Sequence, residues 1–478
     1  MFRMHLLFLI LVISITYSVA QAPDTLWTKT YGDSSYDFGS SIIQTNNNSF
    51  IISGTMGTQL SGNSYTTDIW VFGIDENGTK LWSHNYGGMG GGEIENASDD
   101  EFFVAAETFN QGSWEDMQLL KINSLGDTLW TKTFYYTQHE YAPDIERTPD
   151  GGLVLLEYTY GYPKGALLIK VNESGDTLWT RFFPDNLYSL YPSSPQIDND
   201  KGILFLIQEL DSSFIYKTDS LGNLLSINKV CTGPYSANKF LMTEDGNYLI
   251  LGRYSPTSDS SVIWISHIDN NFSPIWSNTY FSSTKFSYPT NVIKSNTEGY
   301  LIIGYESEES YSPSNGTILK INNSGDLIWR KSFGGVLSEK FRDILMLGNN
   351  QFFVIGTTES FGAGENDAWV LKFSADTATS AVKNDDNSKL PQGYILNQNY
   401  PNPFNPNTKI SWQALVGSWQ TLMIYGVLGN VVETIVDEYR PAGSYEIEWD
   451  ASSYPSGVYF YQLRTENYTE TKKMLLIK

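Results

Sequence analysis

The stretch Gly126-Asp127-Thr128-Leu129-Trp130 decides the fold, because versions of it recur along the chain. Each version places an aromatic residue just after a tight turn, and the copies are spaced by 47 to 55 residues along residues 24–374. Clear copies end at Trp27, Trp82, Trp130, Trp179 and Trp329. Two copies are degraded, since Ser226 replaces one Trp and Phe272 replaces the glycine that should precede Trp276. A fixed period of this kind indicates a repeat architecture.

Each anchor is followed by a short strand, a variable loop, a second strand, an apolar run and a fourth strand, which gives seven units of four strands. The apolar runs follow polar turns and lie at 50–53, 102–105, 153–156, 203–207, 248–251, 300–303 and 352–355. One such unit cannot bury both of its faces alone, so neighbouring units must pack around an axis. The sequence therefore predicts an all-β fold with a seven-bladed β-propeller over residues 21–376. The tryptophans are interpreted as packing groups, because one large aromatic side chain can fill the seam between blades.

Composition supports this fold class and limits the partners. Aromatic residues reach 14% and charged residues only 17%, a balance that suits pleated, half-buried surfaces. The net charge of −23 should repel phosphate backbones, so we expect no nucleic-acid partner. Cys231 is the only cysteine, which excludes an intramolecular disulfide. His84, His139 and His267 fall in different repeats, so we expect no metal site and no cofactor.

The N-terminus reads as a signal peptide over residues 1–20. Arg3 precedes an apolar stretch at 6–15, and Ser18-Val19-Ala20 offers small residues at −3 and −1, which predicts cleavage before Gln21. The apolar stretch is shorter than the ~20 residues of a membrane span, and no later segment approaches that length. We therefore expect no transmembrane helix in the mature chain.

The two edges of the predicted blades differ in their connections. Tight Gly, Asn and Asp turns serve one edge, while long aromatic loops serve the other, which makes the long-loop edge the candidate recognition face. Tyrosine combines a flat apolar face with a polar tip, as glycan and peptide recognition require. The alternative is that these rings only cover the blade tops. The candidate ligand-binding residues are Tyr135, Tyr136, His139, Tyr141, Tyr188, Tyr191 and Tyr288.

Catalysis is the less favoured hypothesis for the function of the propeller. No nucleophile elbow, metalloprotease helix, phosphate loop or dinucleotide fingerprint occurs in the sequence. Carboxylates on the long-loop edge, such as Glu107, Asp144 and Glu209, leave glycoside chemistry open, because that reaction needs two carboxyl groups ~5–9.5 Å apart. Asp198 opens a stretch that superficially resembles a calcium loop but lacks its twelfth-position glutamate.

A second domain follows a polar linker at residues 377–393. The stretch 394–406 contains three prolines, which remove donors for strand pairing, so we expect a rigid extended edge there. Alternating strands are expected at 409–412, 421–425, 431–436, 445–449, 458–463 and 473–477. This pattern over residues 394–478 predicts a small β-sandwich.

Five ordered blocks of this domain carry a resemblance. They are Gln398-Asn399-Tyr400-Pro401-Asn402-Pro403-Phe404-Asn405-Pro406, Ile424-Tyr425-Gly426-Val427-Leu428-Gly429, Ala442-Gly443-Ser444-Tyr445 with Trp449-Asp450, Ser456-Gly457-Val458-Tyr459-Phe460, and Lys472-Lys473-Met474-Leu475-Leu476. The domain closely resembles the type A C-terminal sorting domain of the Bacteroidetes type IX (Por) secretion system, an immunoglobulin-like sandwich. The propeller repeats look like those of many surface proteins in the same bacteria, but that likeness is generic.

The resemblance implies export across the outer membrane, with this domain as the sorting signal. It also implies two partners, the type IX translocon and a sortase-like peptidase that removes the domain while joining the cargo to anionic lipopolysaccharide. Gly426 stands where the family more often has Asn or Asp, and Gly417-Ser418-Trp419 lacks the usual Leu-Pro, which leaves anchoring versus release open. The implied location is secreted or on the outer-membrane surface.

Three functions remain for the propeller. The leading hypothesis is a non-catalytic platform that binds an extracellular glycan, peptide or protein through the long-loop edge. The alternatives are an extracellular polysaccharide hydrolase or lyase with acidic residues at the propeller mouth, and a purely structural spacer or adhesin without a discrete pocket.

Overall fold

The structure is a computed structural model that describes most of residues 22–376 and 395–478. Outside the description lie residues 1–21, 60–64, 99, 110–114, 137–142, 160–163, 185–190, 210, 258, 281, 283, 285, 311, 377–394, 415–417, 441–442 and 466–467. The predicted signal peptide and linker therefore lie outside the described residues. None of the described residues forms a helix long and apolar enough to cross a membrane.

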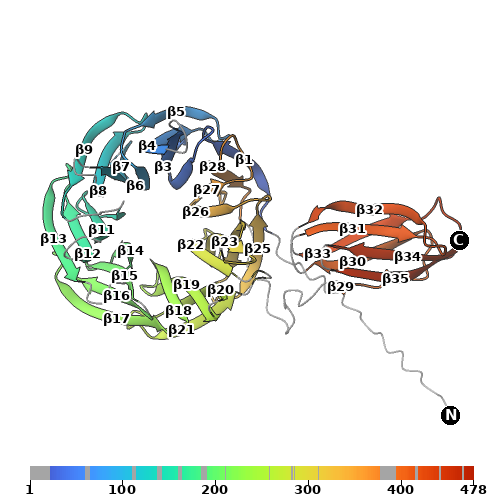
Figure 1. The fold of residues 1–478 in the computed structure, drawn as a ribbon. Helices are drawn as coiled ribbons and strands as arrows, with labels where there is room; N and C mark the ends of the chain where they lie inside the picture. Colours follow the sequence, from blue (N-terminus) through green and yellow to red (C-terminus); the bar gives the residue numbers. More distant parts are fainter. Residues whose placement is uncertain are drawn as a thin grey trace, which may run out of the picture.

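Six blades are built from consecutive antiparallel strands arranged around a ring (Figure 1). Blade 1 contains β2 (Phe38–Gln44), β3 (Phe50–Gln59), β4 (Tyr65–Ile74) and β5 (Lys80–Asn85). Blade 2 contains β6 (Gly90–Ser98), β7 (Glu101–Phe109), β8 (Glu115–Asn123) and β9 (Thr128–Phe134). Blade 3 contains β10 (Asp144–Arg147), β11 (Leu153–Thr159), β12 (Gly165–Val171) and β13 (Thr177–Pro184). In every blade the first strand faces the centre of the ring, and the fourth strand lies outermost.

The same order continues through the second half of the ring. Blade 4 contains β14 (Tyr191–Ile197), β15 (Ile203–Gln208), β16 (Ser212–Thr218) and β17 (Leu224–Thr232). Blade 5 contains β18 (Tyr235–Met242), β19 (Tyr248–Thr257), β20 (Ser260–Ile268) and β21 (Pro274–Tyr280). Blade 6 contains β22 (Phe286–Lys294), β23 (Tyr300–Ser307), β24 (Ser314–Ile321) and β25 (Leu327–Phe333). The all-β, seven-bladed fold class predicted from the repeats is confirmed.

Blade 7 is assembled from both ends of the propeller sequence. Its inner three strands are β26 (Glu339–Met346), β27 (Phe352–Thr358) and β28 (Asp367–Phe373), and its outermost strand is β1 (Thr25–Tyr31), which pairs antiparallel with β28. The sequence repeat is therefore shifted by one strand from the structural blade, because each tryptophan anchor occupies the outermost strand. This pairing of chain ends closes the ring without leaving a free sheet edge at the join.

Seven apolar clusters fill the seven seams between blades, and each draws its side chains from two neighbouring blades. At the closing seam, Phe72 and Ile52 of blade 1 pack with Phe353 and Ile355 of blade 7. These side chains are fully buried. The ring is therefore continuous in its core as well as in its backbone.

The repeated tryptophan is a latch between blades. Each latch tryptophan lies against the glycine of the last turn in the following blade, where a Cβ atom would approach the indole to 2.6–2.8 Å. These glycines have φ between +73° and +83°, so the position excludes a side chain by contact and by backbone conformation. The latch pairs are Trp27–Gly78, Trp82–Gly126, Trp130–Gly175, Trp179–Gly222 and Trp276–Gly325.

The two degraded repeats are the two halves of one missing latch. Ser226 on β17 stands where blade 4 would supply its tryptophan, and Phe272 stands in the turn of blade 5 that would supply the glycine. With no indole to accommodate, the turn can carry a side chain, and Phe272 stacks on Tyr248 with ring centroids 5.3 Å apart. The two substitutions therefore compensate for each other within one seam.

The C-terminal domain is a sandwich of two sheets. One sheet has the order β29 (Ile395–Leu396), β30 (Asn407–Ala414), β33 (Gly443–Asp450). The other has the order β32 (Val431–Arg440), β31 (Ser418–Tyr425), β34 (Gly457–Arg464), β35 (Thr469–Leu476). Trp412, Trp449 and Tyr461 lie in the core between them.

The proline-rich segment of this domain runs along β35, where the sequence predicts an extended edge. Asn402 Oδ1 accepts the backbone N–H of Leu475 at 2.9 Å, and the backbones of Phe404 and Ile477 are joined by a hydrogen bond of 3.0 Å. The Phe404 side chain is buried against Trp449, with ring centroids 5.7 Å apart. The prolines therefore stiffen a segment that one aromatic side chain anchors.

Candidate functional site: the channel mouth

The inner strands share an irregularity in their pairing with the second strands. In six of the seven blades the register between the first and second strands shifts, which leaves unpaired residues on the inner strand. A β-bulge of this kind bends the strand and redirects a side chain, and bulges are common beside active sites. The skipped positions include Ser40, Gly92, Glu93, Ser194, Asn238, Thr290 and Arg342.

Glycines on the second strands make room for four of these bulges. A Cβ atom on Gly54, Gly252, Gly304 or Gly356 would lie 1.9–2.2 Å from a backbone carbonyl oxygen of the adjacent inner strand. In each case that carbonyl belongs to the residue two positions before the bulged one, for example Phe38 before Ser40. None of the four glycines has positive φ, so it is close backbone approach that requires glycine here.

The bulged residues converge on one cavity. Its volume is about 370 Å³, and its lining residues are Ser40, Gly92, Glu93, Pro143, Asp144, Asn238, Pro289, Thr290 and Arg342. All of them lie on or beside the inner strands, mostly in their first halves. Inner strands begin where the connections from the preceding blade arrive, so the cavity lies at the end of the channel bordered by the long loops. Its size is at the lower end of ordinary ligand pockets, ~300–1,000 Å³.

Side chains of this ring also tie neighbouring blades together. Glu93 Oε2 accepts the backbone N–H of Ile145 at 2.9 Å, and Asp144 Oδ2 accepts the backbone N–H of Ser194 at 2.8 Å. Across the closing seam, Asp343 Oδ2 accepts the backbone N–H of Ile42 at 2.9 Å. Each of these bonds uses one oxygen of its carboxylate. The bonds fix the carboxylates in place and leave a second oxygen on each of Glu93 and Asp144, of which Glu93 Oε1 faces Lys239 Nζ.

Carboxyl groups from blades 2 and 3 crowd one side of the channel. Desolvation raises the pKa of Glu93 to about 8, with the Asp144 charge adding to it. Desolvation likewise raises the pKa of Glu95 to about 7 and that of Glu146 to about 8. Glu93 and Lys239 keep 34% and 28% of their side-chain surface accessible, yet enclosure by the ring still disfavours the isolated charges.

Lys239 is the positively charged side chain within this cluster of carboxyl groups. Its Nζ lies 3.7 Å from Glu93 Oε1. Desolvation alone would lower its pKa, but the carboxylates Glu93, Asp144 and Asp343 outweigh that effect and raise it. Lys239 therefore remains charged, and it partly neutralises a wall that holds more acids than bases.

The described residues place some of the predicted ligand-binding tyrosines near this mouth and leave others outside. Tyr288 lies on β22, directly before the lining residue Pro289. Tyr135 and Tyr136 follow β9 and are 66% and 39% exposed, and neither lines the cavity. Tyr191 begins β14, but its side chain is not described. His139, Tyr141 and Tyr188 lie outside the described residues.

Of the three carboxylates singled out from the sequence, only Asp144 lines the cavity. The sequence reasoning missed Ser40, Glu93, Asn238, Thr290 and Arg342. A signal for them existed in the repeats, since four of the seven apolar runs are followed directly by a glycine, at Gly54, Gly252, Gly304 and Gly356. A strand glycine at a fixed repeat position marks a bulge or a close backbone approach, and here it marks the strand beside four of the six bulges.

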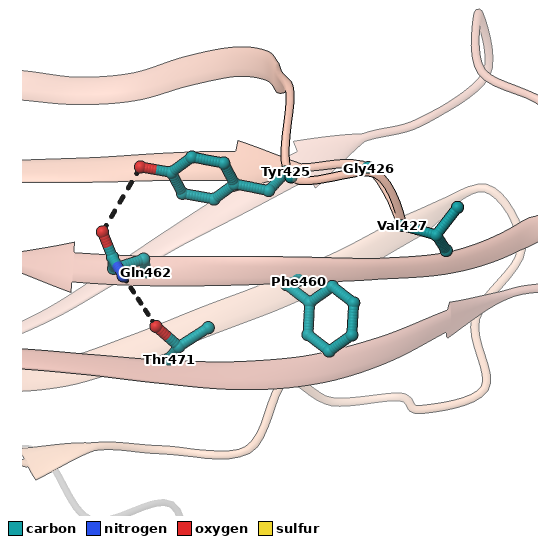
Figure 2. A pocket seen from close by; sticks show the side chains of 7 residues that line it. Tyr425, Gly426, Val427, Phe460, Gln462 and Thr471 are labelled. Carbon is teal, nitrogen blue, oxygen red and sulfur yellow. Dashed lines mark hydrogen bonds between the residues drawn. The ribbon is translucent and has the colours of Figure 1, made fainter.

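A second hollow lies on the C-terminal domain and has a different character (Figure 2). It measures about 390 Å³ and is lined by Tyr425, Gly426, Val427, Gly429, Phe460, Gln462 and Thr471. The polar groups drawn there bond to one another, from Tyr425 to Gln462 at 3.3 Å and from Gln462 to Thr471 at 2.8 Å (Figure 2). Because these groups are satisfied internally, the channel cavity is the better candidate for a polar ligand.

No described group of His, Cys, Asp and Glu side chains in this structure has the arrangement of a metal site. In the stretch that resembles a calcium loop, Asp198 Oδ1 accepts the backbone N–H groups of Asp200 and Gly202, and Oδ2 pairs with Lys217 at 2.8 Å. The Asp198 carboxylate therefore serves the turn itself.

Comparison with known proteins identifies the C-terminal domain. Residues 398–478 match the family model described as the secretion system C-terminal sorting domain. Within this match, Asn402 and Phe404 hold the extended segment on β35, as described above, and Gly429 has φ of +79° in the turn after β31. Lys472 pairs with Glu470 at 3.2 Å. A search of curated proteins found no match.

Solved structures with a similar fold are distant in sequence. An ulvan lyase of a polysaccharide lyase family shares 7% identity with a TM-score of 0.49, covering 71% of this chain and 95% of the lyase. A Dyadobacter fermentans protein of unknown function shares 11% identity with a TM-score of 0.44, covering 74% and 99%. The Porphyromonas gingivalis surface protein PorZ shares 9% identity with a TM-score of 0.31, covering 94% and 75%.

The ring of blades and the matched sorting domain define an exported β-propeller protein. The chain is a cargo of the type IX secretion system, which its C-terminal domain directs to the cell surface or the extracellular space.

Proposed function

We propose that the propeller is a non-catalytic module that binds an extracellular ligand at the mouth of its channel. The observation that supports this most is the convergence of bulged residues from several blades on one cavity of about 370 Å³. Bulges disrupt strand pairing, so repeating them around the ring has a structural cost that a binding site would explain. The predicted recognition edge and this cavity lie at the same end of the channel.

The lining suits a polar ligand rather than an apolar one. Ser40, Thr290 and Asn238 offer hydroxyl and amide groups, and Glu93 and Asp144 each hold an oxygen beyond the bond that ties the blades. Asn238 Oδ1 is buried without a hydrogen-bond partner. An unpaired buried acceptor is costly, and a ligand that donates a hydrogen bond would relieve it.

A binding screen of extracellular polymers and peptides against the chain from residue 21 onward, sorting domain included, tests this function. The variant Ser40→Trp fills the cavity, and we expect it to lower affinity at least tenfold. Its matched control is Ser174→Trp, in an exposed turn on the opposite edge, which should bind like the unaltered chain. Equal binding by all three proteins would move the site away from the channel mouth.

The second candidate is a polysaccharide hydrolase or lyase, and the carboxyl groups of Glu93, Glu95 and Glu146 favour it. Their raised pKa values mean that protonated carboxyls are present near neutral pH, as a general acid requires. Product release from a polysaccharide panel, lost in Glu93→Gln, would establish this candidate. A panel that yields binding but no product would favour the first.

A further inference from the structure

Three cations gather beside the cavity, on the side away from the carboxyl wall. Arg342 lines the cavity, and Lys340 lies two residues before it on β26. Arg253, on β19, places its guanidinium 4.9 Å from the ring centroid of Tyr288, and Tyr288 stacks on Tyr305 with centroids 5.0 Å apart. Lys340 Nζ lies 5.3 Å from the Tyr305 centroid. The two tyrosines therefore hold the flanking cations in a fixed array next to Pro289 and Thr290.

These cations differ from the buried lysines on the third strands of blades 2, 3 and 7. Lys121, Lys170 and Lys372 each pair with a carboxylate at 2.7–3.0 Å. Arg253, Lys340 and Arg342 have no carboxylate partner within the described part of the chain, although the chain carries 53 acidic and 30 basic residues. Arg253 Nε is buried without any hydrogen-bond partner, and burial lowers the pKa of Arg342. Cations without a carboxylate partner in so acidic a chain are suited to an anionic partner.

The opposite wall constrains what that partner can be. The Asp144 carboxylate would repel a ligand that is anionic throughout, whereas Glu93 and Asp144 both accept hydrogen bonds from hydroxyl groups. Asn238 on blade 5 and Thr290 on blade 6 also line the cavity and add further hydroxyl-binding groups. The ligand should therefore carry one anionic group for Arg342 and several hydroxyl groups for the remaining lining. An acidic peptide supplies the anions but few hydroxyl donors.

We propose that the cavity binds an acidic saccharide, with its anionic group at Arg342 and its hydroxyl groups toward Glu93, Asp144 and Asn238. This proposal rests on the binding function proposed above and names its ligand class. The shared chemistry is a sugar ring bearing a carboxylate or a sulfate. Arg253 and Lys340 add positive potential through the tyrosine pair, which positions them without placing them in the cavity.

Matched polymer pairs test the proposal with the chain from residue 21 onward. Polygalacturonate is compared with its methyl ester, and dextran sulfate with dextran, so that each pair differs in the anionic group. We expect the anionic member of at least one pair to bind tenfold or more tightly than its neutral partner, with affinity falling as salt rises. The pair that discriminates identifies the anion as carboxylate or sulfate. Polyglutamate serves as the acidic peptide and should bind at least tenfold more weakly.

Point variants test whether Arg342 contacts the anionic group of the ligand. Arg342→Ala should reduce binding of the anionic polymer at least tenfold, Arg342→Lys should recover part of it, and Lys80→Ala, which removes an exposed cation on β5, should change nothing. Equal binding of both members of every pair would overturn this proposal but leave the binding function standing. Binding of polyglutamate as tight as that of the saccharides, or equal losses in Arg342→Ala and Lys80→Ala, would also overturn it. Failure of every probe to bind would count against both proposals.

Discussion

The innermost and outermost strands of the blades differ in how far their residues are repeated around the ring. The outermost strands repeat the same register shift at their anchors in all seven blades, and they repeat one contact, the tryptophan latch, in five of the seven seams. The innermost strands are irregular at a shared position, yet their bulged residues differ in chemistry from blade to blade, from Ser40 to Glu93 to Arg342. The outermost strands form the rim of the propeller, and the contact repeated there keeps the ring closed. The innermost strands line the channel, and their varied residues let one scaffold present an asymmetric polar surface.

The largest effect should come from the rim. Trp329 on β25 is 6% exposed and packs in the cluster between blades 6 and 7. Trp329→Ala leaves a cavity at this seam and should lower the free energy of unfolding by about 3–5 kcal/mol, measured by chemical denaturation. Leu178→Ala, on the outermost strand β13 with Leu178 55% exposed, is the control and should change it by less than about 0.5 kcal/mol. Equal losses would refute the assignment of stability at this seam to the buried Trp329 side chain.

The next effect should come from the glycines behind the bulges. Gly304→Ala places a methyl group 2.2 Å from the carbonyl oxygen of Tyr288, so the bulge that presents Thr290 must shift. We expect a loss of about 1–3 kcal/mol in unfolding free energy together with weaker ligand binding. Gly348→Ala, where a Cβ atom meets nothing within 4 Å, should preserve both properties. A stable Gly304→Ala protein with normal binding would separate the bulge from the site.

The tryptophan repeats of the rim could be predicted from the sequence, whereas the residues that line the channel could not. Trp27, Trp82, Trp130 and Trp179 repeat one residue in one role, so periodicity alone indicates the blades and their number. Ring closure joins Thr30 to Trp369, a pairing that no local pattern encodes. The compensation between Ser226 and Phe272 also required the structure, because it links two repeats across a seam.

The bulged residues escaped prediction for a physical reason. A bulge is defined by backbone register, and the residue at the bulge is free to vary, so Ser40, Asn238 and Thr290 share no side-chain signature. The recurring partner, present beside four of the six bulges, is the glycine on the adjacent strand, as at Gly54 and Gly252. The sequence therefore pointed to the candidate site only through glycines that do not line the cavity.

A smaller effect on stability should come from a carboxyl group in the channel, and it should depend on pH. The pKa of Glu146 is raised to about 8, chiefly by desolvation and further by Glu95 and Glu93, while Lys239 opposes the rise. The folded state thus binds a proton that the unfolded state releases, so this group makes stability fall as pH rises from about 5 to about 8. Glu146→Gln removes that penalty. It should match the unaltered chain at pH 5 and melt a few degrees higher, about 2–4 °C, at pH 8.5.

The control for the pH experiment is Glu244→Gln, in an exposed turn on the opposite edge. Its melting temperature should follow that of the unaltered chain at both pH values. A higher melting temperature for Glu146→Gln already at pH 5 would mean that the carboxyl is ionised there, contrary to the enclosure described for the channel.

The smallest effect should fall on the exposed loop tyrosines. Tyr135 is 66% exposed, so Tyr135→Ala should change the free energy of unfolding by less than about 0.5 kcal/mol. Tyr288→Ala, by contrast, removes the ring that stacks with Tyr305 and faces Arg253, and should weaken anionic ligand binding several-fold. Because both tyrosines belong to the edge predicted from sequence, comparing their binding losses asks whether recognition spreads over that edge or is confined to the channel mouth. Equal losses would extend the site outward along the loops, and a loss in Tyr288→Ala alone would confine it to the inner strands.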